Sequence, residues 1–435
     1  MTKHGLNRNT IFFALLAMGL VGTARAQSDD EALAEAGDWV QILLPAGGYV
    51  GAWITGDKQG AIQLTKALGA AGVSAHFFKQ VAERGRPDAT DSRSFPSGHT
   101  TAAFAGSEFI RIRYGNAWGI PATVAAAFVG YTRIRANKHF RDDVLAGASN
   151  GLMWNWYFTS PYADSMAIRP TAYDDGYGFD IHYEFGGERL PNPDDGRSAR
   201  FRYTLEWGPV SQDTNLFRSP LNGGFPIDLA TAETEFDFTS RVSFDYFADR
   251  HEWSGYLAPM ELIEFDTASV LTEPAQFAGT VFEPIPDSDF EARYNFIEAR
   301  AVYRYRLHES DRSTVRIGGG ASYQQSLLGI TQFFGTPRNK TVIDSATADI
   351  KEVKAIASLR MQHRFTRRIE VEFQVDGFPG SDHYLNTALL LNWRAAPGWS
   401  MGIGARYIDR EVSSDDVYNK LQVGDLVLTV SHDFS

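Results

Sequence analysis

The sequence predicts an α + β chain, with an N-terminal all-α helix bundle followed by an antiparallel transmembrane β-barrel of about 12 strands. Two observations carry this prediction. Residues from about 29 to 162 are rich in Ala and Gly and place apolar residues at helical spacing, whereas the rest of the chain alternates apolar and polar residues with period two. At 435 residues, the chain is long enough for both parts.

The N-terminus reads as a secretory signal peptide over residues 1–26. A basic start with Lys3 and Arg8 precedes an apolar run from Ile11 to Val21, and Ala24-Arg25-Ala26 forms an A-x-A cleavage site. The alternative, an uncleaved anchor helix, is disfavoured because the apolar run is too short to span a bilayer. We therefore expect a helical domain over residues 27–163 in the periplasm and a barrel over residues 164–435.

Five helices are expected in the first part, over residues 39–55, 59–83, 97–114, 117–136 and 142–158. The stretches 39–56 and 144–163 are free of charge and are transmembrane candidates on length alone. Polar residues inside them, Gln41, Asn150 and Asn155, favour a buried bundle in a soluble domain instead. A chain bound for the outer membrane must also cross the inner one, where strongly apolar helices would be retained.

The alternating segments predict the strands of the barrel, with aromatic residues on the apolar side. They cover residues 179–185, 199–207, 236–246, 253–265, 298–307, 315–323, 355–365, 369–376, 385–393, 401–407 and 426–434. An additional strand, placed over 166–172, is needed for the barrel to start from a periplasmic N-terminal domain, which gives the number of about 12. A soluble β-sandwich is the alternative, but its strands are usually shorter and its polar face less charged.

The connections between strands predict the orientation of the barrel. Short turns fall at 248–252, 308–312, 366–368 and 395–398, and long polar loops at 211–234, 269–289 and 333–348. Outer-membrane barrels place short turns in the periplasm and long loops outside. Charged residues on the polar side of the strands, such as Arg304, Arg360 and Glu372, are expected to pair and fill a narrow lumen.

Composition narrows the class of partner. The net charge of −12 and the pI near 5.3 argue against nucleic acid, whose binders present basic faces. The chain contains no cysteine, so neither a thiol nucleophile nor a cysteine-ligated metal is available.

Three short motifs in the helical part carry chemistry. They are Lys79 with Arg86-Pro87, the word Pro96-Ser97-Gly98-His99, and Thr132-Arg133 followed by His139 and Asp143. Three cations, two histidines and an acid supply what phosphoryl transfer needs without a metal. His139 and Asp143 are four residues apart and share a face of a helix, so the acid can hold one ring nitrogen. Asp142 is the ambiguous neighbour, being three residues from His139. His76, Arg84, Arg135 and Lys138 lie nearby and are given no role.

These motifs resemble the signature of the PAP2 superfamily of type 2 phosphatidic acid phosphatases and vanadium haloperoxidases, with Thr132 in place of a serine as the one departure. The resemblance covers about residues 30–160. It implies that His139 is the nucleophile, that Asp143 orients it, and that His99 is the general acid and then the base. It also implies a set of phosphate-binding residues: Lys79, Arg86, Ser97, Gly98 and Arg133. No metal or cofactor is expected.

The sequence thus predicts a metal-independent phosphatase for phosphate monoesters, with lipid phosphates favoured, acting through a phosphohistidine at the periplasmic face of the bacterial outer membrane. Its expected partners are a phosphate-ester substrate and the outer membrane itself, not nucleic acid. Two alternatives stay open. One is an outer-membrane pore or transporter whose helical domain is inactive, and the other is a vanadium-dependent haloperoxidase, because the same residues can bind vanadate.

Overall fold

The computed structural model divides the chain into two compact units, residues 1–189 and 190–435. The residues that it describes are 29–162, 166–173, 176–183, 200–218, 227–229, 237–266, 274–336, 339–380, 382–413 and 417–434. The predicted signal peptide lies outside the described residues.

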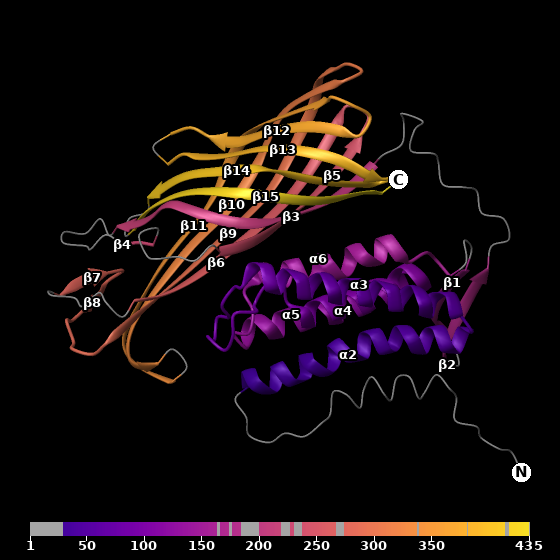
Figure 1. Cartoon of the computed structure of the whole chain (residues 1–435), viewed down its shortest axis with the longest axis horizontal. Coiled ribbons are helices and arrows are strands. Elements are labelled where there is room, and N and C mark those ends of the chain that lie inside the picture. The colour runs from indigo at the N-terminus through magenta and orange to yellow at the C-terminus, as the bar shows by residue number, and fades with distance from the viewer. Residues whose placement is uncertain are drawn as a thin grey trace, which may run out of the picture. The chain divides into compact units, whose positions relative to one another are not determined.

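The first unit holds the five expected helices (Figure 1). They are α2 (Asp29–Thr55), α3 (Lys58–Ala82), α4 (Gly98–Tyr114), α5 (Asn116–Arg135) and α6 (Arg141–Phe158). The main difference from the prediction is the start of α2, which begins at Asp29 rather than Trp39 because the Ala- and Glu-rich residues between them also favour a helix.

Helix α4 is the centre of this bundle and packs against α2, α3, α5 and α6. Small residues allow α6 to approach it closely. A Cβ on Gly147 would lie 2.5 Å from the Ser97 carbonyl oxygen, and one on Gly151 would lie 2.6 Å from the Ala105 nitrogen. This close contact brings the beginnings of α4 and α6 together, which is where the second and third sequence motifs lie.

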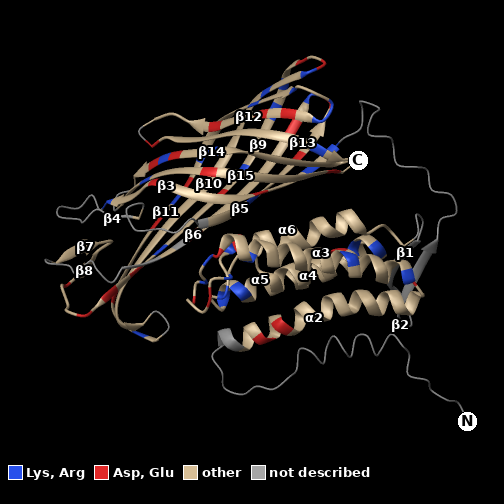
Figure 2. Ribbon diagram, in the orientation of Figure 1, with Lys and Arg blue, Asp and Glu red and all other residues tan. Residues whose placement is uncertain are grey.

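The outward faces of α2 and α5 are apolar. Trp39, Ile42 and Trp53 on α2 are each more than half exposed, as are Val124 and Tyr131 on α5. Figure 2 shows α2 free of charge along most of its length, with acidic residues only near its beginning. Such faces are unusual, because exposed helix surfaces normally carry polar side chains.

None of the helices in the described part of the chain combines the length and the apolarity needed to cross a membrane.

A hairpin of two strands follows the helices and corrects the predicted strand number. Strands β1 (Met166–Tyr173) and β2 (Gly176–Tyr183) pair with each other in a separate two-stranded sheet. The barrel therefore has 10 strands rather than about 12. Both segments are strands, as predicted, but neither alternation nor the expected strand number reveals which neighbours a strand pairs with.

The second unit is a closed antiparallel barrel (Figure 1). Its strands are β3 (Arg200–Arg218), β5 (Asp237–Ala248), β6 (His251–Asp266), β9 (Asp289–Glu309), β10 (Ser313–Thr336), β11 (Asn339–Arg364), β12 (Ile369–Phe378), β13 (Tyr384–Ala396), β14 (Trp399–Ser413) and β15 (Tyr418–Phe434). The barrel closes where β15 pairs with β3, from Tyr418 opposite Arg218 to Phe434 opposite Phe201. Three short strands are not counted among the ten strands of the wall. Strand β4 (Ile227–Asp228) pairs with the end of β3, and β7 (Ala275–Phe277) pairs with β8 (Thr280–Phe282) in a separate sheet.

The four predicted short turns all lie at one end of the barrel, which also holds the start of β3 and the end of β15. Two predicted loops are wrong in part or in whole. Residues 211–218 of the predicted 211–234 loop belong to β3, which ends at Arg218. Over 333–348, β10 and β11 continue as a paired hairpin with Thr336 opposite Asn339. Gly335 and Asn339 near the tip of this hairpin are residue types common in loops, which is why the sequence favours a loop there.

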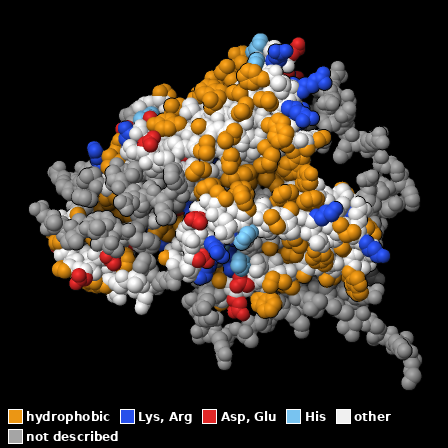
Figure 3. Space-filling model, in the orientation of Figure 1, with side chains coloured by type: hydrophobic (Ala, Val, Ile, Leu, Met, Phe, Trp, Pro, Cys, Tyr) orange, Lys and Arg blue, Asp and Glu red, His pale blue; other side chains and the backbone are white. Residues whose placement is uncertain are grey.

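The barrel wall is apolar outside and charged inside, the reverse of a soluble β-sandwich. Leu389, Ile403 and Trp253 are about half exposed, whereas Arg304 and Arg410 are almost completely buried. Figure 3 shows hydrophobic side chains covering the visible part of this wall. Water would not favour such an outer surface, and a lipid environment would.

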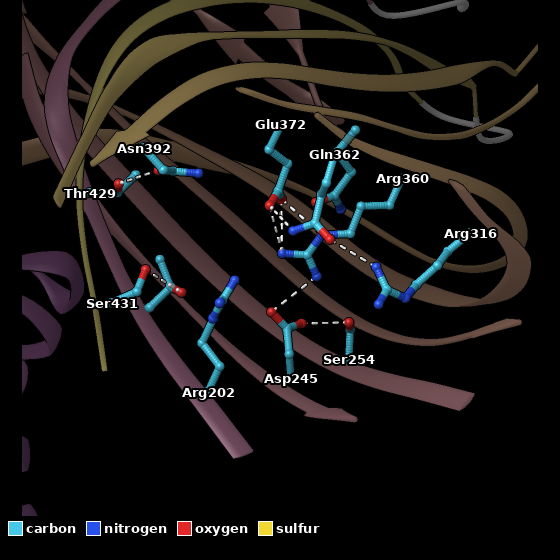
Figure 4. A network of polar contacts seen from close by, with 12 residues as sticks. Arg202, Asp245, Ser254, Arg316, Arg360, Gln362, Glu372, Asn392, Thr429 and Ser431 are labelled. Carbon is cyan, nitrogen blue, oxygen red and sulfur yellow. Dashed lines mark hydrogen bonds and ion pairs between the residues drawn. The ribbon is translucent and has the colours of Figure 1, made fainter. Parts of the chain in front are cut away.

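Ion pairs fill the interior toward the short-turn end (Figure 4). The Arg360 guanidinium lies 2.8 Å from Glu372, 2.9 Å from Glu252 and 3.1 Å from Asp245. Arg304 contacts the same Glu252 carboxylate at 2.6 Å. These side chains leave a cavity of only about 40 Å³, which confirms the prediction that charge pairs fill a narrow lumen.

Apolar side chains fill the interior toward the opposite end. Phe217, Phe296 and Leu328 are buried there, and Phe277 and Phe282 from the β7–β8 hairpin join the same cluster. In the described residues, the barrel thus holds an ionic layer and an apolar layer in series.

Candidate active site

His139 and Asp143 lie together at the start of α6. His139 ends the loop after α5, and its Nδ1 is 3.5 Å from Oδ2 of Asp143 in the first turn of the helix. Both side chains are buried. The backbone N–H of Phe140 donates to the same carboxylate at 2.9 Å, which fixes the acid in place. With Nδ1 facing Asp143, the Nε2 atom of His139 is the ring nitrogen left for a substrate.

Two residues that the sequence analysis gave no role complete this pair. Arg84 Nη1 donates to Asp142 at 2.7 Å and to Asp143 at 3.0 Å, and all three side chains are almost fully buried. The Ser94 hydroxyl donates to Oδ2 of Asp143 and lies 3.5 Å from His139 Nδ1. A buried arginine two residues before Arg86 could not be distinguished from an exposed one in the sequence.

The geometry also separates the two neighbouring acids. Asp143 faces His139 and Ser94, whereas Asp142 faces Arg84. Of the two, Asp143 is therefore the acid in contact with the histidine ring.

The Pro96–His99 segment forms the start of α4 next to this pair. Ser97 is the N-cap, and its hydroxyl accepts from Thr100 N–H at 3.4 Å. Its own N–H donates to the Asp143 carbonyl at 3.0 Å, so a backbone hydrogen bond joins the two motifs. The first N–H groups of α4, at Gly98 and His99, have no partner within the helix, the arrangement that binds anions at helix N-termini.

The cations surround the histidines. Lys79, in the last turn of α3, donates to the Arg93 carbonyl at 2.6 Å, and Arg86 pairs with Asp91 at 2.7 Å. Burial lowers the pKa of His139, and the positive charges of Lys79 and Arg86 lower it further, whereas Asp143 acts in the opposite direction. Burial and the charge of Arg86 lower the pKa of Lys79 itself to about 8.

Arg133 and His99 share a carboxylate from α2. Asp38 Oδ1 lies 2.7 Å from Arg133 Nη1 and 3.1 Å from His99 Nε2. Burial and the charge of Arg133 lower the pKa of His99 to about 4, while Asp38 acts in the opposite direction. Asp38 lies far from the motifs in the sequence, and nothing in its local pattern marked it as part of the site.

Asp143 is held as a carboxylate. Burial alone would raise its pKa, but Arg84, His139 and Ser94 outweigh that effect and lower it to about 2. The structure thus brings together Lys79, Arg86, Ser97, Gly98, His99, Arg133, His139 and Asp143 at one end of the helical unit. Among the described residues, no group of three His, Asp or Glu side chains is arranged to hold a metal ion.

Fold and site together define a chain with a helical domain, in which a His–Asp pair is ringed by cations, and a closed β-barrel. Residues 60–166, within the helical domain, match the model of the PAP2 superfamily. A curated relative described as a lipid A 1-phosphatase, from Porphyromonas gingivalis, is 34% identical over 118 residues. This match covers 26% of the present chain and only 26% of that relative.

Solved structures similar to the two units were also found. OmpT, an outer membrane protease from Escherichia coli, matches with a TM-score of 0.34 and 9% identity, over 57% of this chain and 99% of that one. LpxE from Aquifex aeolicus matches with a TM-score of 0.26 and 25% identity, over 33% of this chain and 92% of that one.

Proposed function

We propose that this protein is a metal-independent phosphatase that hydrolyses phosphate monoesters, lipid phosphates in particular, through a phosphohistidine intermediate. The observation that carries the proposal is the buried His139–Asp143 pair facing two cations and a second histidine. The superfamily match over residues 60–166 supports the same reaction class.

The reaction follows from the positions of these groups. His139 Nε2 attacks phosphorus while Asp143 holds Nδ1, and the phosphorus–oxygen ester bond breaks. His99 gives its proton to the departing alkoxide and then takes a proton from water. That water attacks phosphorus, the phosphorus–nitrogen bond breaks, and inorganic phosphate leaves. Lys79, Arg86, Arg133 and the α4 N-terminus stabilise the charge on the phosphoryl oxygens.

The apolar outer faces of α2 and α5 support a lipid substrate. Trp39 and Tyr131 are exposed next to Asp38 and Thr132, at the end of each helix that borders the site. Acyl chains on these faces would place a headgroup phosphate near the cations. The similar lipid A 1-phosphatase, though matched over a quarter of its length, points the same way.

We place the barrel in the bacterial outer membrane and the helical domain in the periplasm. The apolar outer wall supports the first part, as does the aromatic cluster of His251, Trp253 and Tyr303 near the short turns. The second part follows from the start of β3 at the short-turn end, which in such barrels faces the periplasm.

The test uses the full chain in detergent with a chromogenic phosphate ester, with and without a chelator. We expect His139→Ala to lose at least ~10³-fold in kcat, whereas His76→Ala, an exposed histidine on α3, keeps wild-type activity. Brief incubation with a ³²P-labelled ester should label the wild type with an acid-labile, alkali-stable phosphate. Undiminished hydrolysis by His139→Ala would sink the mechanism, and loss of activity with chelator would contradict metal independence.

Substrate class and location need separate measurements. A lipid phosphate in mixed micelles should give a kcat/KM well above that of a soluble monoester, and equal values would argue against a lipid substrate. The protein should fractionate with outer membranes and migrate differently on gels before and after heating. Recovery in the soluble periplasmic fraction would refute the membrane placement.

A further inference from the structure

The N-terminal part of α2 contacts the site, although none of the three motifs includes it. Asp38 Oδ1 lies 2.7 Å from Arg133 Nη1 and 3.1 Å from His99 Nε2. One carboxylate oxygen therefore links the cation of the third motif to the histidine of the second.

Two further contacts fix this helix against Arg133. Arg133 Nη2 donates to the carbonyl of Ala34, one turn before Asp38. Gly37 packs so tightly that a Cβ there would lie 2.2 Å from Thr132 Oγ1 and 2.8 Å from Arg133 Nη2. A glycine at this point lets the α2 backbone reach the end of α5, and Asp38 follows directly.

We propose that Asp38 is a positioning residue of the phosphatase reaction, holding the His99 ring and the Arg133 guanidinium in a fixed relation. The inference rests on the proposed function and adds α2 to the elements that contribute residues to the active site. It explains how two side chains from different helices are kept in one arrangement, because the same carboxylate oxygen contacts both of them.

Electrostatics gives this arrangement a chemical consequence. The charged groups that act on His99 come from every neighbouring element: Asp38 of α2, Arg86 before α4, Arg133 of α5 and His139 before α6. Three of them disfavour the protonated ring, and Asp38 alone among the four favours it. A general acid must hold its proton until the ester bond breaks. The phosphate-binding cations disfavour the protonated His99 ring, and the negative charge of Asp38 opposes them by stabilising that protonated ring.

Asp38 could act in a second way, which makes the opposite prediction. It could occupy the position of a substrate anion between Arg133 and His99 and compete with phosphate. Its removal would then tighten anion binding and lower KM. Positioning instead predicts a loss in the chemical step and weaker binding of a transition-state mimic, because the two partners become less ordered.

The experiment compares Asp38→Asn with Glu35→Gln, an exposed acid one turn earlier on the same helix. Steady-state hydrolysis of a chromogenic phosphate ester by the full chain is measured across pH, together with inhibition by vanadate. For Asp38→Asn we expect kcat to fall ~10- to 100-fold and vanadate inhibition to weaken. The alkaline limb of the kcat profile, where His99 loses its proton, should move to lower pH. Asp38→Glu should recover part of the loss, and Glu35→Gln should match the wild type.

Each other outcome overturns the inference. A kcat within twofold of wild type removes any role for Asp38, and a lower KM with tighter vanadate inhibition shows competition with the anion. A lower kcat with an unmoved pH profile and no rescue by Asp38→Glu shows a structural role only. Failure of the proposed function would look different, because then the wild type itself would not hydrolyse the ester or would not need His139.

Discussion

Arg84 offers the sharpest test of how the site is held together. Its guanidinium bridges Asp142 and Asp143 at 2.7 and 3.0 Å, and all three side chains are at most 3% exposed. The same group lies over the Phe140 ring, 4.1 Å from its centroid. The perturbation is Arg84→Gln, which keeps a polar side chain and removes the charge.

The expected magnitude follows from burial. Removing one partner of a buried ion pair leaves an uncompensated charge and costs ~3–5 kcal/mol of unfolding free energy. In the intact site the pKa of Asp143 is lowered to about 2, because Arg84, His139 and Ser94 outweigh the effect of burial and favour the carboxylate. Without Arg84, burial dominates and the pKa of Asp143 rises. A protonated Asp143 no longer orients His139, so kcat should fall ~10²-fold or more.

Three measurements check this reasoning: hydrolysis of a chromogenic phosphate ester, its pH profile, and thermal loss of the helical circular dichroism signal. Arg84→Gln should lose activity most at low pH, because protonation of Asp143 there removes the hydrogen-bond acceptor. Lys66→Gln is the matched control, since it removes one positive charge from an exposed position of α3. If Arg84→Gln hydrolyses the ester at the wild-type rate with an unchanged profile, the role of Arg84 is wrong.

Four other predictions follow from the same structure. The pKa values of Asp143 and of Asp57, which pairs with Arg113, are lowered in the folded state. The stability that these carboxylates give the fold is therefore complete above pH ~4 and is lost as the pH falls toward 2. The melting temperature of the helical domain should drop over that range, and the drop should be smaller in Asp57→Asn. The pKa of Lys79 is about 8, so its charge is lost as the pH rises through that value; KM should increase above pH 8, and a KM that stays flat there would exclude Lys79 from phosphate binding. Gly37→Ala should reduce kcat/KM by displacing α2 from Thr132 and Arg133, while Gly69→Ala, where a Cβ meets open space, should not. The full chain in a planar lipid bilayer should give no steady conductance, because ion pairs and an apolar cluster fill the lumen; stable open-channel currents would revive the pore alternative.

The sequence predicted the two-part architecture well, because helical and strand periodicities are local signals. It overestimated the number of barrel strands because it included β1 and β2, which pair only with each other. The pairing partners of a strand are decided by contacts between residues far apart in the sequence. It also assigned the ends of β10 and β11 to a loop, because Gly335 and Asn339 near the tip of that hairpin are residue types common in loops.

For the site, the motifs identified a set of side chains that the fold brings together, but not the groups that hold them. Arg84 and Ser94 lie close to the motifs in the sequence, yet only burial shows that they contact Asp143. Two helices, α3 and α4, separate Asp38 from Arg133 in the sequence, and the two residues meet through the antiparallel contact of α2 with α5. Arrangements of this kind depend on tertiary packing, which a single sequence does not reveal.

The hydrogen bond from Ser97 N–H to the Asp143 carbonyl has a practical consequence. It joins the two halves of the site through main-chain atoms, and the glycine contact of α6 with the Ser97 carbonyl reinforces it. Side-chain substitutions at His99 or His139 leave this link untouched. Inactive variants should therefore retain the shape of the site, which makes them suitable for capturing an uncleaved substrate from a lipid extract and identifying it by mass spectrometry.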